Sequence, residues 1–194
     1  PLDRAVMAKL ALVIRQATDA LNAYEHSKAL EVIESFFWQF CDDYIELVKN
    51  RAYGTADAHG KVPSDAAVKS ARTALGLGLD AFARLLAPYL PYASEEVWSW
   101  MHTGEGSVHR AAWPKADIYA AAATGASPET LAWAGKAVEQ LRKIKSEAKV
   151  SMKPPILSVA LSAVSEGVDA IHAALGDIAQ AGRVVGKFDL VAKH

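Results

Sequence analysis

The sequence lacks the features that several common classes of protein require. It contains one cysteine, Cys41, so an internal disulfide and a cysteine-based zinc site are both excluded. No apolar run approaches the roughly 20 residues that cross a bilayer, and no signal-like segment opens the chain. We therefore expect a cytoplasmic protein without membrane contact.

An excess of charge of one sign is also lacking. The chain has 21 lysines and arginines against 22 acids, a formal net charge of −1, so no overall basic field indicates a nucleic-acid partner. Any basic surface must be local. Neither a GxGxxG nor a GxxxxGK[ST] phosphate loop occurs. With 194 residues and 52% apolar composition, the chain can bury a core as one domain, or as a larger domain with an appendage.

Helical periodicity is what the sequence does contain. Apolar residues recur at three- and four-residue steps over 3–23, where Asp3 is the expected N-cap, and again over 26–50. Gly54 is the expected stop of the second helix. Residues 54–63 are rich in glycine, aspartate and proline, which predicts a loop.

A third helix is predicted to begin at Ser64 or Asp65 and to run to about Leu86. Pro88 and Pro91 end it, because proline lacks the N–H that a helix interior needs.

Shorter elements follow. Ser94 is the expected cap of a fourth helix, and 104–114 predicts an ordered loop. The alanine-rich stretch 115–126 predicts a connector, in which alanine allows another helical turn. The next helix begins with Ser127 as its cap and lasts to about Lys149.

The period then changes from helix to strand. Apolar and smaller residues alternate over 157–161 and again over 184–190. Between them, 165–181 predicts a helix long enough to cross over between parallel strands. The predicted fold is mainly α: an antiparallel helical bundle, residues 1–126, followed by a connecting helix and a small α/β appendage, residues 127–194.

No catalytic centre is indicated. Cys41 lies on the apolar face of a predicted helix and is expected to be a buried core thiol. Adjacent helical residues such as Asp42 and Asp43 point about 100° apart, so they do not converge on one atom. Asp42, Glu46 and Lys49 share a face, either as a charge ladder or with an acid that orients a neighbouring arginine toward RNA.

Local groups of basic residues make contact with a nucleic acid the better hypothesis. They lie at the end of the second helix, in the 104–114 loop, and along 141–153, where a basic stripe could follow a phosphate backbone. A solvated helix face is the alternative for this stripe. The candidate residues are Lys49, Arg51, His109, Arg110, Arg142, Lys143 and Lys145.

Tryptophans supply a second feature of nucleic-acid binding, because unpaired bases stack on aromatic rings. Trp98 lies at a core spacing and is expected to be buried. Trp38 and Trp100 lie off the main apolar stripes, so we expect them to be exposed.

Four segments resemble valyl-tRNA synthetases in order and spacing. They are FFWQFCDDYIELVKNRAYG (36–54), LLAPYLPYASEEVWSWM (85–101), GSVHRAAWP (106–114) and LRKIKSEAKVSMKP (141–154). The second and third are shared with isoleucyl and leucyl relatives, whereas CDDYIELVKNRAYG is much more specific to the valyl type. The resemblance covers essentially the whole chain.

This resemblance implies a C-terminal anticodon-binding fragment whose bundle receives the anticodon stem and loop of valine tRNA. It implies no cofactor in the fragment; ATP with magnesium would serve the full-length enzyme, whose catalytic and editing domains would be partners of this part. The HIGH and KMSKS signatures of the family are absent from these residues. Three alternatives remain: a docking module that braces the synthetase body, the equivalent domain of an isoleucyl-type enzyme, and an independent enzyme.

Overall fold

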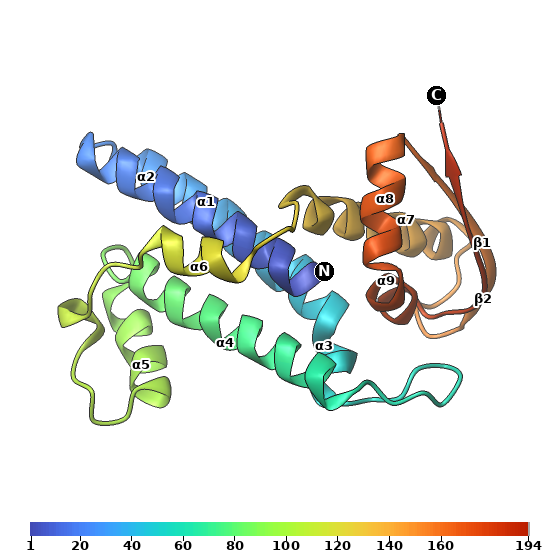
Figure 1. Ribbon diagram of the computed structural model, residues 1–194, viewed down its shortest axis with the longest axis horizontal. Coiled ribbons are helices and arrows are strands. Elements are labelled where there is room, and N and C mark those ends of the chain that lie inside the picture. Colours follow the sequence, from blue (N-terminus) through green and yellow to red (C-terminus); the bar gives the residue numbers. More distant parts are fainter. Residues whose placement is uncertain (194) are drawn as a thin grey trace.

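Long helices run back and forth through the first part of the chain in the computed structural model, which describes residues 1–193 (Figure 1). In chain order the elements are α1 (Leu2–Asn22), α2 (His26–Gln39), η1 (Phe40–Ile45), α3 (Glu46–Tyr53), α4 (Asp65–Leu86), α5 (Pro91–Met101), η2 (Val108–Arg110), α6 (Ala116–Ala122), α7 (Glu129–Glu147), β1 (Ile156–Ala163), α8 (Ser165–Ala173), α9 (Leu175–Gly182) and β2 (Val184–Ala192). The prediction of a mainly helical bundle with a small α/β part is confirmed.

The predicted helix over 26–50 is a continuous rod with an irregular middle. α2 passes directly into η1, a π-helical segment, and η1 passes into α3. A π segment adds a residue to the turn and therefore rotates the side chains of α3 around the helix axis relative to those of α2. The rod ends at Gly54, whose φ of 72° is the left-handed conformation expected of a helix stop.

The predicted caps Asp3 and Ser94 are wrong, and Ser127 lies one residue before Pro128, the N-cap of α7. α1 begins at Leu2, so Asp3 lies inside its first turn, where it is buried. α5 begins with Pro91 at its first position, which proline favours, and Ser94 is a buried residue of the helix interior. Ser64 does cap α4, because its side chain accepts a bond from the N–H of Ala67.

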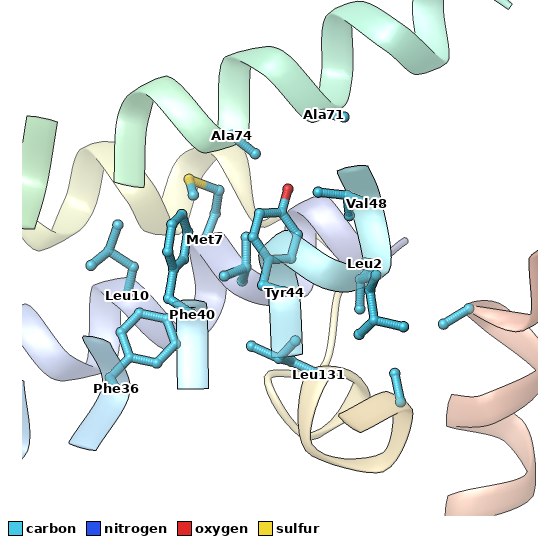
Figure 2. Packing of buried hydrophobic residues seen from close by; sticks show 14 of the residues in the cluster. Leu2, Met7, Leu10, Phe36, Phe40, Tyr44, Val48, Ala71, Ala74 and Leu131 are labelled. Atoms are coloured by element: carbon cyan, nitrogen blue, oxygen red, sulfur yellow. The ribbon is translucent and has the colours of Figure 1, made fainter. Parts of the chain in front are cut away.

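Aromatic rings fill the seam between α2, η1 and α4. Phe40 packs against Phe36, Tyr44 and Phe82, with ring centroids between 5.2 and 6.4 Å apart. Figure 2 shows Phe36, Phe40 and Tyr44 among the buried residues of this core. Burial of such rings supplies most of the hydrophobic stabilisation of a bundle.

The tryptophans divide as expected. Trp98 is buried beside the loop that follows α5 and donates to the carbonyl oxygen of Gly106. Trp38 and Trp100 are exposed, with 54% and 69% of their surface accessible.

Cys41 is only half-buried rather than a core thiol, and burial raises the pKa of its side chain.

The C-terminal part is a parallel two-stranded sheet with a helical crossover. β1 pairs with β2, and α8 and α9 lie between them in sequence (Figure 1). The crossover is two helices joined at Ala174, not the one predicted over 165–181. The connector before α7 also contains a helix, α6.

The hydrophobic core continues into the appendage. The boundary expected between residues 126 and 127 falls in the loop before α7, yet one cluster of buried apolar residues includes both Leu2 of α1 and Val184 of β2. Among residues 1–193, every helix is too short or too polar to cross a membrane.

Gly78 of α4 allows the close approach of Phe40. A Cβ at this position would lie 2.6 Å from the Phe40 ring, whereas one at Gly76 would meet nothing within 4 Å. We expect Gly78→Ala to lower the unfolding free energy by about 1–3 kcal/mol, the cost of overpacking a core. The matched Gly76→Ala should raise it by up to about 1 kcal/mol, from helix propensity. Urea unfolding of both variants measures this, and equal effects would contradict the packing described.

Candidate nucleic-acid interface

Arg51 forms a buried ion pair with two aspartates. Its guanidinium donates two bonds of 2.7 Å to Asp3 of α1, and bonds of 3.0 and 3.1 Å to Asp177 of α9. A further bond reaches the carbonyl oxygen of Ala67 in α4. The side chain is 15% exposed. Since a guanidinium has five N–H groups, all of them are used within the protein. Arg51, predicted to contact tRNA, therefore has no donor left for a phosphate.

The two aspartates of this network have opposite pKa shifts. Burial alone would raise the pKa of Asp3, but bonds from Arg51, Ser70 and Tyr44 outweigh burial and hold it below its usual value. The pKa of Asp177 is raised, because burial outweighs its bonds to Arg51. The pKa of Arg51 itself is raised by its two carboxylate partners despite burial, so the guanidinium stays charged.

Lys145 is the second candidate cation that turns inward. Its ammonium donates to the carbonyl oxygens of Met152, Pro154 and Gly182, at 3.1, 2.8 and 3.2 Å. The residue is 6% exposed, and burial lowers its pKa. An ammonium has three donors, and all three are used. Lys145 thus joins α7 to the 152–154 loop and to the end of α9, and it is not a member of an exposed stripe.

Lys49 and Arg142 are brought together by one carboxylate. Glu46 Oε2 lies 2.6 Å from Lys49 Nζ and 3.6 Å from Arg142 Nη2. All three side chains are between 38% and 46% exposed. Each cation therefore keeps donors that face solvent. The acid at position 46 orients an arginine of α7 at the surface, which is the arrangement that the sequence left open.

Other charged groups surround this pair. Asp43, on the same rod, lies against α7 at Gly135, and the pKa of its carboxyl is raised by burial and by Asp42. Lys143 is 60% exposed and lies 3.9 Å from Glu147. The surface where η1 and α3 meet α7 thus carries both signs of charge.

His109 and Arg110 lie apart from this cluster. Both are exposed residues of η2, which follows α5 at the opposite end of the bundle from the sheet (Figure 1). His109 Nε2 is 3.3 Å from the carbonyl oxygen of Pro91. The exposed Trp100 and Tyr92 are on α5, beside this segment. The seven candidate residues therefore divide into two surface groups and two further residues, Arg51 and Lys145, that are buried and bonded within the protein.

Residues 1–193 hold no group of three or more histidine, cysteine, aspartate or glutamate side chains placed to bind a metal ion. A cavity of about 960 Å³ among these residues is lined by Asp3, Arg51 and Asp177, so its charged groups are already bonded to one another.

The fold and the surface define a helical-bundle binding domain with clustered arginine, lysine and carboxylate groups. The chain belongs to the family described as the anticodon-binding domain of tRNA ligase, whose model matches residues 3–161.

Several proteins are similar over the whole chain. A valine–tRNA ligase of Bifidobacterium longum subsp. infantis is 88% identical over 194 residues, which is 100% of this chain and 21% of that protein. A valine–tRNA ligase of Thermobifida fusca is 45% identical over 186 residues, 95% of this chain and 20% of that protein. The chain spans about a fifth of the length of these curated relatives.

The change in folding stability as the pH is lowered tests the ion-pair network. Because the pKa of folded Asp3 lies below its ordinary value of 3.8, its carboxylate stabilises the fold above that value, and this contribution is lost as pH falls through the folded pKa. Asp177 has a raised pKa, so its contribution has the opposite sign and is lost as pH rises.

We expect Asp3→Asn to lower the unfolding free energy at neutral pH by about 2–3 kcal/mol, the range for a lost hydrogen bond to a charged group. The variant should also lose less stability than the parent chain below about pH 5. Asp19→Asn, on the exposed face of the same helix, is the control. Urea titrations across pH measure both effects; an unchanged acid response in Asp3→Asn would refute the account.

Proposed function

We propose that this chain recognises the anticodon stem and loop of a valine tRNA, as part of a valine–tRNA ligase. The observation that carries the proposal is the family match over 3–161, together with near-complete coverage of the chain by valine–tRNA ligases. The equivalent domain of an isoleucyl-type enzyme is the alternative; binding of isoleucine tRNA in preference to valine tRNA would support it.

The surface formed by Glu46, Lys49 and Arg142 is the proposed contact with RNA. Unpaired anticodon bases present donors and acceptors on their edges, and proteins read them with planar and charged side chains. Glu46 holds Arg142 at the surface, with guanidinium donors left for a phosphate or a base edge. Neighbouring carboxylates can accept from base amino groups.

The mixed charge of this surface determines how strongly RNA affinity should depend on salt concentration. Lys49, Arg142 and Lys143 lie near Asp42, Asp43 and Glu46, so only about two or three phosphates can be neutralised. For a single strand, each neutralised phosphate adds about 0.7 to the slope of log affinity against log salt. The slope expected here is therefore about −2, far shallower than for a strongly basic RNA-binding protein.

In the whole protein, ATP with magnesium would activate valine, and catalytic and editing domains of the longer chain would complete the reaction in the cytoplasm. The part played by this chain is to hold the tRNA.

Charge reversal tests the proposed surface. Lys49→Glu and Arg142→Glu should each weaken binding of a valine tRNA transcript about tenfold and make the salt slope shallower by roughly 0.7. Lys28→Glu is the matched control, because Lys28 is 64% exposed on α2 and pairs only with Glu25 among the described residues. Fluorescence anisotropy at several salt concentrations measures this. Equal affinity in all four proteins would favour the docking-module alternative.

Lys143 and Lys145 provide a second pair for comparison. Lys145→Met should lower the unfolding free energy by about 1–3 kcal/mol, because three carbonyl oxygens lose their donor. Lys143→Met should change it by less than about 0.5 kcal/mol. For RNA affinity of the folded protein the order should reverse, with only Lys143→Met weakening binding. A Lys145→Met variant of normal stability and weak binding would contradict the assignment.

A further inference from the structure

A groove of about 960 Å³ separates the end of α3 and the 54–64 loop from α9 and β2. In Figure 1 this loop, which joins α3 to α4, extends toward α9 and the strands. Arg51 is the one predicted tRNA contact that lines it. Ligand sites in proteins have volumes of roughly 300–1,000 Å³, so the groove is large enough for a nucleotide.

The acids that line the groove already have partners. Asp3 and Asp177 share the guanidinium of Arg51 on its floor. Asp57 accepts bonds of 2.9 Å from the backbone N–H groups of His59 and Lys61, which contribute to the lowered pKa of its carboxyl. These carboxylates are therefore engaged within the protein.

The basic side chains at the rim, unlike these acids, have no oppositely charged partner among the described residues. His59, Lys153 and Arg183 are exposed, and within residues 1–193 none lies within 4.0 Å of an acidic side chain. Arg183 donates to the carbonyl oxygen of Lys153 at 2.6 Å, which keeps the two residues side by side. The rim therefore presents Lys153 and Arg183 as cations without an acidic partner, beside carboxylates that are bonded within the protein, and such cations can receive an anion.

Arg183 is also held in an unusual backbone conformation. Its φ is 57°, in the left-handed region that few residues other than glycine adopt, and its carbonyl accepts a 2.8 Å bond from the N–H of Ile156. Arg183 is the C-cap of α9, where the left-handed conformation ends the helix and places Arg183 directly before β2.

Apolar surface completes the groove. Pro63, Pro155 and the half-buried Phe188 of β2 line it. The strand carries an extra residue here, because its register with β1 shifts between Ile156 and Ser158. At Gly186 a Cβ would lie 1.9 Å from the carbonyl oxygen of Leu157, so a side chain does not fit at this wall.

We propose that this groove binds one unpaired nucleotide of the RNA that the chain recognises. The base lies against Phe188 and Pro155, and the phosphate meets Lys153 and Arg183. A flat apolar body with one negative charge matches flat apolar walls with an unpaired basic rim, as in other single-strand sites. The inference rests on the proposed function, because it extends the bound RNA from the bundle to the appendage.

Occlusion of the groove is the sharpest test. Gly176 of α9 lines it, and a Cβ at this helical position meets nothing within 4 Å, so Gly176→Trp places an indole at the opening without a clash at Cβ. Gly76→Trp is the matched control, a helical glycine of α4 with the same open space and outside the groove. Circular dichroism and urea unfolding of the intact chain establish that both variants fold.

The probe is an RNA hairpin carrying the valine anticodon, with 4-thiouridine in its loop. We expect Gly176→Trp to weaken binding about tenfold, the loss typical of one stacked base, and Gly76→Trp to change it by less than about twofold. Irradiation of the parent complex should crosslink the loop to 54–64 or 183–188.

A second variant removes dependence on the bulky side chain. Lys153→Glu, in an exposed loop, should weaken binding and reduce the same crosslinks. Normal binding by Gly176→Trp and Lys153→Glu, with crosslinks confined to α3 and α7, would overturn the groove proposal and leave the proposed function standing. Failure of the parent chain to bind the hairpin would overturn both.

Discussion

The pairing of Arg51 with Asp3 and Asp177 is the interaction on which the rest of the structure depends. It joins α3 to α1 and α9, and through Ala67 to α4, so one side chain fixes the bundle and the appendage together. Charges taken from water cost several kcal/mol each, and the loss is recovered only where every donor and acceptor has a partner. Here all five guanidinium N–H groups are used, and Tyr44 and Ser70 donate to the remaining lone pairs of Asp3.

The ion pair of Arg51 affects which basic side chains remain on the surface to contact an RNA. Arg51 and Lys49 are two residues apart on α3, which places their side chains about 200° around the helix from each other. The same separation relates Lys145 to Lys143 on α7. In each pair one cation faces inward and is saturated with acceptors, while the other faces solvent. The inward members position α9 and the 152–154 loop, and the outward members keep donors that face solvent.

The long elements of the fold could be predicted because their evidence is local. Apolar periodicity over 26–50 and 65–86, the stop at Gly54 and the start of α4 at Asp65 each depend on neighbours in the sequence. The caps at Asp3 and Ser94 were wrong because α1 and α5 each begin earlier than predicted, so both residues lie inside the helix and are buried. The break at Ala174 and the half-burial of Cys41 likewise depend on packing across the fold.

The sequence by itself determined the class of fold and, through its resemblance to valyl-tRNA synthetases, the family, because periodicity and motif wording are properties of the chain order. Only the tertiary structure decided which basic residues face solvent and which are bonded inside the protein. A cation's role depends on the acceptors within about 3 Å, and those acceptors come from residues as far away in the chain as Asp177 is from Arg51. The groove between α3 and β2 is likewise formed by segments that the sequence keeps apart.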